Sequence, residues 1–276
     1  MFTLNCKGKL LALDQPIVMG IINITPDSFY EGYYGKEKDA IISLAEKMIT
    51  DGASILDIGG QSSRPGSQRL DAETEAARVL PVISALHKAF PAVILSIDTY
   101  HSVVATAAVK EGASIVNDIS SGNLDPEMIQ TVAGLKVPYI AMHMKGTPET
   151  MQLDPVYEDV VKEVLDFFIM KTAECHEAGI NDIILDVGFG FGKTTQHNFS
   201  LLKNMHVFKM AGKPVLAGLS RKGMIYRTLK NTAADALNGT TALNMFALQQ
   251  GANILRVHDV KEAMECIRLF NELSGA

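Results

Sequence analysis

One local pattern recurs five times along the chain and constrains its fold more than any other feature. In each instance a helix-like stretch stops at a glycine, and a short apolar run that ends in a polar residue follows. The instances cover residues 52–57, 112–117, 179–186, 212–220 and 251–256. Glycine tolerates the left-handed backbone that closes a helix, and a continuous apolar run is typical of a strand buried on both faces. The repeat predicts parallel strands whose polar ends carry the chemistry.

The rest of the chain fits the same alternation of strands and helices. Strands are predicted at residues 17–23, 55–59, 93–98, 115–118, 138–143, 183–186, 214–218 and 254–257. Helices are predicted at 38–50, 72–90, 102–111, 126–133, 157–178, 199–210 and 260–273. A further helical region follows the strand at 214–218 and ends at residue 250. No linker divides the sequence, so we expect residues 1–276 to form a single (β/α)₈ TIM barrel with its active site at the C-terminal ends of the strands. A doubly wound open sheet alternates in the same way, but the absence of a dinucleotide fingerprint favours closure.

Composition narrows the class of protein. A chain of 276 residues, 47% of them hydrophobic, can bury a large core. The net charge of −6 argues against nucleic acid as a partner. The N-terminus has no signal-like segment and no apolar stretch reaches the length of a membrane span, so we expect a cytoplasmic protein without a membrane partner. Cys6, Cys175 and Cys266 lack metal-binding spacing and are interpreted as packing or solvated thiols.

Three catalytic signatures each fail at one position. A Walker-like ending at residues 192–194 has Val187 where its first glycine is required. A dinucleotide-binding start at residues 188–190 has Lys193 in place of its third glycine. A nucleophile elbow at residues 218–222 ends in Lys222 instead of glycine. ATPase, dehydrogenase and serine hydrolase activities are therefore disfavoured.

Polar residues stand at the end of every predicted strand. They are Asn23, Asp57, Asp98, Asn117, His143, Asp186, Ser220 with Lys222, and Arg256 with His258. The acceptors among them, Asp98, Asn117 and Asp186, suit a flat heterocycle that is rich in N–H groups. Arg64, Arg256 and His258, with Asn23 as an oxygen ligand for Mg²⁺, suit a diphosphate. The sequence thus predicts a heterocyclic substrate that carries a diphosphate leaving group.

The same segments carry a specific resemblance. NITPDSF (23–29), DIGGQSSRPG (57–66), DT (98–99), ND (117–118), MHM (142–144), DVGFGFGK (186–193), SRK (220–222) and RVH (256–258) resemble, in this order and over nearly the whole chain, the dihydropteroate synthase family of pterin-binding enzymes. The resemblance implies a pterin-binding TIM barrel over residues 1–276. It also implies condensation of 6-hydroxymethyl-7,8-dihydropterin diphosphate with 4-aminobenzoate, giving 7,8-dihydropteroate and diphosphate in folate biosynthesis.

The resemblance also implies a role for individual positions. The pterin would contact Asp98, Asn117, Met142, Asp186 and Lys222, and the diphosphate would contact Asn23, Arg64, Arg256 and His258, with Asn23 holding Mg²⁺. The 4-aminobenzoate would contact Ser63, Arg64, Pro65, Phe191, Ser220 and Lys222, and a mobile loop would carry Asp27 and Phe29. The catalytic set would be Asp98, Asp186, Lys222, Arg256 and His258.

The family's mechanism and assembly follow as expectations. The diphosphate leaves first, the pterin-methyl cation is attacked by the arylamine, and the late helices form a homodimer. The chain departs from the family's pattern at Gln61, where Glu is usual, at Ser63 (Thr) and Val187 (Pro), and in its first loop at residues 30–34. Two alternatives stay open: a pterin-dependent corrinoid methyltransferase, which has no need of the SRK and RVH segments, and a pterin-binding paralogue without synthase activity.

Overall fold

Eight parallel strands close into a barrel in the computed structural model, which describes residues 1–24, 34–61, 69–151 and 155–275, with residues 34–38 described by their backbone alone. The barrel strands are β3 (Ile17–Asn23), β4 (Ile55–Gly59), β5 (Ile94–Asp98), β6 (Ile115–Asp118), β7 (Tyr139–Met142), β8 (Ile183–Asp186), β9 (Val215–Ala217) and β10 (Ile254–Val257). Each pairs with its neighbour along the chain, and β10 pairs with β3 to close the ring. The predicted (β/α)₈ barrel is confirmed.

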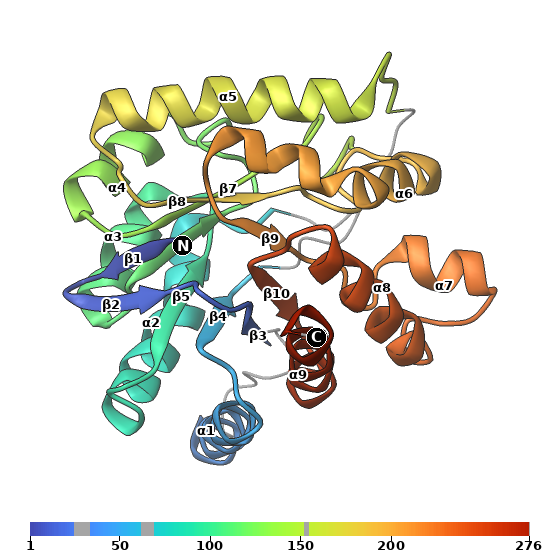
Figure 1. Cartoon of the computed structure of the whole chain (residues 1–276). Helices are drawn as coiled ribbons and strands as arrows, with labels where there is room; N and C mark the ends of the chain where they lie inside the picture. The colour runs from blue at the N-terminus through green and yellow to red at the C-terminus, as the bar shows by residue number, and fades with distance from the viewer. Residues whose placement is uncertain (25–33, 62–68, 152–154, 276) are drawn as a thin grey trace.

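Helices surround the barrel, as Figure 1 shows, with α5 along one side and α1 and α9 on the opposite side. They are α1 (Tyr34–Thr50), α2 (Ala72–Ala89), α3 (Ser102–Glu111), α4 (Met128–Leu135), α5 (Val160–Ala178), α6 (Thr195–Lys203), the 3₁₀ helix η2 (Met205–Ala211), α7 (Gly223–Leu229), α8 (Leu237–Gln249) and α9 (Val260–Gly275). The predicted glycine stops are observed, for example at Gly112, whose φ of 126° places it in the left-handed region.

Two helix predictions were wrong in detail. The helix predicted at 199–210 is divided at Asn204 into α6 and η2. Thr194 starts α6 earlier than predicted, because its side chain accepts a hydrogen bond from the His197 backbone in a capping box. The helical region that ends at 250 contains two helices, α7 and α8.

An antiparallel hairpin, which the sequence analysis did not predict, precedes the barrel. It consists of β1 (Thr3–Cys6) and β2 (Lys9–Ala12). Leu4, Cys6 and Leu13 are buried in one cluster with a single apolar residue from each of the eight barrel strands. That barrel layer is Met19, Ile55, Ile94, Ile115, Ile140, Ile184, Leu216 and Ile254. The hairpin therefore closes the end of the barrel that lies opposite the carboxyl ends of the strands.

Candidate active site

A polar layer lies directly above the apolar layer of the barrel interior. Side chains alternate along a strand, so the residue two positions beyond each apolar residue also points inward. On four strands this residue is Asp57, Asn117, Asp186 or Arg256. Asp98 lies two positions further along β5 and is paired in register with Asn117 of β6. The strand period thus brings together most of the predicted pterin-binding residues.

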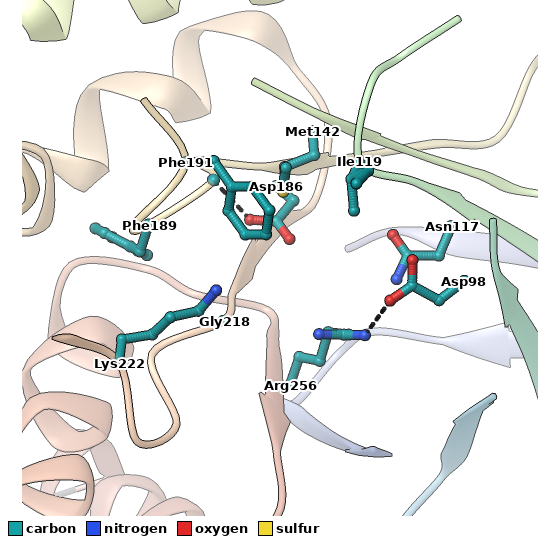
Figure 2. A pocket seen from close by; sticks show the side chains of 11 residues that line it. Asp98, Asn117, Ile119, Met142, Asp186, Phe189, Phe191, Gly218, Lys222 and Arg256 are labelled. Carbon is teal, nitrogen blue, oxygen red and sulfur yellow. Dashed lines mark hydrogen bonds and ion pairs between the residues drawn. The ribbon is translucent and has the colours of Figure 1, made fainter. Parts of the chain in front are cut away.

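These residues line a pocket of about 320 Å³, including its open mouth, at the carboxyl ends of the strands. The lining consists of Asp98, Asn117, Ile119, Met142, Asp186, Gly188, Phe189, Phe191, Gly218, Lys222 and Arg256. Figure 2 shows Asp98, Asn117 and Arg256 on one side of the pocket. Asp186, Phe191 and Lys222 lie on the facing side. A flat molecule between the two sides would meet polar groups at both edges.

Arg256 is held by two carboxylates on its side of the pocket. Its Nε lies 2.6 Å from Asp57 Oδ2, and its Nη2 lies 2.5 Å from Asp98 Oδ2. Burial raises the pKa of Asp98 to about 7, although the positive charge of Arg256 opposes the shift. Asp98 thus combines a fixed orientation with an ionisation close to neutral pH.

The segment after β8 forms the facing side. Asp186 Oδ1 accepts a hydrogen bond of 2.8 Å from the Gly188 backbone, which fixes the carboxylate, and burial raises the pKa of Asp186. Gly188 has φ 69°, and a Cβ at this position would lie 2.0 Å from the carbonyl oxygen of His143. Glycine is required here for both reasons.

Lys193, at the end of this segment, is a buried lysine that holds it in place. Its Nζ donates to the carbonyl oxygens of His143 (3.0 Å), Gly188 (2.9 Å) and Phe191 (2.9 Å). Three acceptors match the three N–H groups of an ammonium ion, while burial lowers the pKa of Lys193 to about 7. The segment that bears Phe189 and Phe191 is therefore attached to the end of β7.

Lys222 lies over the ring of Phe191, with its Nζ 4.3 Å from the ring centre, in the geometry of a cation–π contact. Burial, followed by repulsion from Arg256, lowers the pKa of Lys222 to about 8. Met142, 3% exposed, packs with Ile119 and Phe191 in an apolar cluster at the same face. Apolar and cationic groups therefore both face the pocket.

His258 and Ser220 meet at the rim, because the His258 backbone N–H donates to Ser220 Oγ over 3.2 Å. Loss of solvent around the imidazole, followed by repulsion from Arg256, lowers the pKa of His258 below its ordinary value. The residue remains exposed at the surface. A neutral imidazole at the mouth can donate a hydrogen bond to an anionic group.

Asn23, at the end of β3, is exposed near this mouth. A Cβ on Gly59 would lie 3.7 Å from both Asn23 Oδ1 and Asp98 Oδ2, so these two oxygens flank the glycine. An amide oxygen is a ligand that Mg²⁺ accepts, and this ion commonly combines one or two protein ligands with substrate phosphates and water. Within the described residues, no group of three or more His, Cys, Asp or Glu side chains could hold a metal ion. Asn23 could therefore supply one protein ligand to a magnesium ion whose other ligands come from a diphosphate and water.

Several predicted residues do not enter this description. Asp27, Phe29, Ser63, Arg64 and Pro65 lie outside the described residues. His143, a member of the strand-end set, does not line the pocket, because its ring packs edge-on against Phe167 at 5.0 Å.

The structure describes the environment of two residues that depart from the family's pattern. Gln61 accepts hydrogen bonds from the Tyr100 hydroxyl (2.8 Å) and the Leu70 backbone (3.3 Å). Val187 is fully buried in the core. Val187 is thus accommodated by the core, whereas Gln61 Nε2 is buried without a hydrogen-bond partner among the described residues.

Sequence reasoning gave no role to four lining residues and two supporting ones, although Asp57 belonged to the strand-end set. Ile119, Gly188, Phe189 and Gly218 line the pocket, while Asp57 and Lys193 hold residues that do. The alternating glycines before Lys193 were a usable signal, because glycine at every second position suggests a segment with left-handed turns.

Comparison with known proteins agrees with this geometry. Residues 19–258 match the family model described as pterin binding enzyme. The chain is 41% identical to the dihydropteroate synthase of Haemophilus influenzae, over 99% of both chains.

Two solved structures from Xanthomonas albilineans are similar in fold and sequence. Its dihydropteroate synthase with 4-aminobenzoic acid superimposes with a TM-score of 0.91 at 39% identity, over 99% of this chain and 98% of that one. The same enzyme in complex with 7,8-dihydropteroate gives a TM-score of 0.88 at 36% identity, over the full length of both chains.

The barrel and its polar pocket define a pterin-binding enzyme. The relatives cover the chain from end to end and share one activity. The chain belongs to the pterin-binding enzyme family and, within it, to the dihydropteroate synthases.

Proposed function

We propose that the pocket at the carboxyl ends of the strands is the site at which the chain acts as a dihydropteroate synthase. The chain is a transferase of folate biosynthesis that joins 6-hydroxymethyl-7,8-dihydropterin diphosphate to 4-aminobenzoate, with release of diphosphate. The observation that carries the site assignment is the pair of fixed carboxylates, Asp98 and Asp186, on opposite sides of one narrow pocket.

The pterin ring occupies the space between these carboxylates. Asp98 and Asn117 provide acceptors at one edge, and Asp186 provides acceptors at the other. Hydrogen bonds to a charged group contribute more than neutral ones, so a heterocycle rich in N–H groups is favoured. Met142 supplies an apolar surface for the ring, and Lys222, on the same side of the pocket as Asp186, supplies a donor.

The diphosphate points toward the mouth of the pocket. His258 and Arg64 contact it, together with Nη1 of Arg256, because Nε and Nη2 of Arg256 are bound to carboxylates. Asn23 would hold Mg²⁺, and the ion would supply neutralisation of the diphosphate charge. Direct support for this ion would be diphosphate-dependent Mg²⁺ binding, measured by calorimetry, that is lost in Asn23→Ala.

The carbon–oxygen bond to the diphosphate breaks first, and the cationic pterin-methyl carbon is stabilised by Asp98 and Asp186. The amine of 4-aminobenzoate then forms the new carbon–nitrogen bond and releases a proton. Phe191, Ser220 and Lys222, with Ser63, Arg64 and Pro65, contact the aminobenzoate. No protein nucleophile is needed, in agreement with the incomplete nucleophile elbow.

Product formation tests this function. The purified chain should convert both substrates to 7,8-dihydropteroate and diphosphate in equal amounts, detected by mass spectrometry. Omission of 4-aminobenzoate should abolish dihydropteroate. Binding of the pterin without turnover would support the non-catalytic paralogue, and methyl transfer from a methylfolate to a corrinoid would support the methyltransferase.

Two further features are proposed for the working protein. The chain forms a homodimer through its late helices, supported by the exposed apolar side chains of Leu229, Phe246, Leu269 and Leu273. Light scattering should give twice the mass of the chain.

The protein works in the cytoplasm. This proposal is supported by three buried cysteines that form no disulfide, and cell fractionation tests it. Within the described residues, no helix has the length and apolar character of a membrane span.

A further inference from the structure

Asp57 lies beneath the pocket without lining it. It is the middle residue of β4, its side chain is fully buried, and it points into the barrel. Its Oδ2 accepts two hydrogen bonds, from Arg256 Nε (2.6 Å) and from Asn117 Nδ2 (3.0 Å). Both donors belong to residues that line the pocket. One buried carboxylate oxygen therefore connects two residues of the site.

The contact fixes the orientation of the Asn117 amide. An amide has a donor end and an acceptor end, and a carboxylate only accepts. The Asn117 nitrogen must therefore face Asp57, so that the amide oxygen points away from it. Figure 2 shows this nitrogen on the side of Arg256 and the oxygen on the other side. Asn117 thus presents an acceptor to a ligand in the pocket.

The contact also fixes the guanidinium of Arg256. Asp57 holds Nε and Asp98 holds Nη2, so the planar group cannot rotate without the loss of a charged hydrogen bond. Asp57 Oδ1 is buried and has no partner among the described residues. A buried carboxylate with one unsatisfied oxygen is costly for the fold, which favours a role in the site over a role in stability.

We propose that Asp57 is a positioning residue for the condensation. It orients Asn117 so that the amide oxygen accepts from the N–H groups of the pterin, and it holds Arg256 against Asp98. Asp57 does not touch the substrate. The inference rests on the proposed pterin site.

An exchange of side chains between positions 57 and 117 tests the inference. The probe is 6-hydroxymethyl-7,8-dihydropterin, which has the ring but no diphosphate, and its affinity is measured by calorimetry on folded protein. Asn117→Asp sets two carboxylates against each other, and affinity should fall by about tenfold or more. In Asp57→Asn combined with Asn117→Asp, the amide at 57 donates to the carboxylate at 117, whose other oxygen is the acceptor for the ring. Affinity should return to within about threefold of wild type.

Ser96→Ala is the matched control, because Ser96 is also buried and is paired in register with Asp57 on the next strand. It should leave ring affinity unchanged. If Asn117→Asp does not fold, Asp57→Ala is compared in wild-type and Asn117→Ala backgrounds. The loss from Asp57→Ala should be clearly smaller when Asn117 is already absent, because only the contact of Asp57 with Arg256 is then left to lose.

Two results would overturn the inference. One is an exchange variant that binds the ring no better than Asn117→Asp. The other is an equal loss from Asp57→Ala in both backgrounds. A wild-type chain that does not bind the ring would contradict the proposed pterin site itself, and the inference with it.

Discussion

At the scale of single residues, the site depends on charges that the barrel buries and then orients. Asp98 and Asp186 are each fixed by one hydrogen-bond donor, Arg256 for the first and the Gly188 backbone for the second. Each carboxylate keeps a second oxygen for a ligand. This arrangement can be tested by removing the charge of Asp98 and by measuring how activity depends on pH.

Asp98→Asn should weaken binding of the pterin ring. An amide cannot accept at both of its ends, and the loss of a charged hydrogen bond costs about 1.5–3 kcal/mol, or roughly ten- to a hundredfold in affinity. Calorimetry with 6-hydroxymethyl-7,8-dihydropterin measures the effect. Asp14→Asn, an exposed change in the segment between β2 and β3, is the control. Wild-type affinity in folded Asp98→Asn would contradict the assignment.

The pH dependence of kcat/KM for the pterin substrate should be bell-shaped. Asp98 must be ionised to accept hydrogen bonds, so activity should rise with pH through its pKa of about 7. Lys222 must be protonated to donate, so activity should fall as pH rises through its pKa of about 8. Lys222→Arg should move the alkaline limb to higher pH. An unchanged alkaline limb in an active Lys222→Arg enzyme would show that Lys222 is not the group that titrates.

That these residues lie together was predictable from the sequence, because strand ends and alternation determine which side chains meet. It could not assign Asp57 or Lys193, whose roles depend on contacts across the fold. Asp57 meets Arg256 from a strand 199 positions away. Lys193 appeared only as a member of sequence motifs and was given no role, because its carbonyl partners depend on how the segment turns back toward β7.

At the scale of elements, the segment between β8 and α6 contributes irregular backbone to the described part of the site. Gly188, Gly190 and Gly192 all have positive φ, and Lys193 binds three carbonyl groups around them. The segment carries one side of the pocket without being a helix or strand.

Lys193→Met should therefore destabilise the protein and weaken ligand binding together. Removal of the ammonium leaves three buried carbonyl oxygens without their donor, at a cost on the order of 3 kcal/mol or more. Thermal or urea unfolding measures the loss. Lys203→Met, an exposed lysine on α6, should change stability by less than about 0.5 kcal/mol. Equal stability of the two variants would refute the role of Lys193.

Helix and strand positions were largely predictable, because the buried strands and glycine stops are local signals. The division of the helix predicted at 199–210 was not, since the apolar pattern continues through Asn204. The β1–β2 hairpin was missed because only two of its side chains, Leu4 and Cys6, are buried, which gives too short an alternation to recognise.

At the scale of the whole molecule, the barrel has one end for stability and one for chemistry. The hairpin and the apolar layer close the first end. The polar layer and pocket occupy the second.

Leu4→Ala should lower the stability of the protein without lowering its activity, because Leu4 lies at the end of the barrel opposite the pocket. Leu4 is 2% exposed within the closing cluster, and truncation of a buried leucine costs about 2–5 kcal/mol. Turnover per folded molecule should stay at the wild-type value, because the pocket lies at the other end. Leu10→Ala, which is exposed in the same hairpin, should change neither quantity. A large fall in kcat of folded Leu4→Ala would show that the two ends are coupled.

The central claim is that the polar layer above the apolar barrel floor binds the pterin. A crystal structure of the chain with 6-hydroxymethyl-7,8-dihydropterin tests it most directly. We predict ring density between Asp98 with Asn117 on one side and Asp186 with Lys222 on the other, with hydrogen bonds from ring N–H groups to both carboxylates. A ring bound elsewhere, or one that contacts neither carboxylate, would contradict the account.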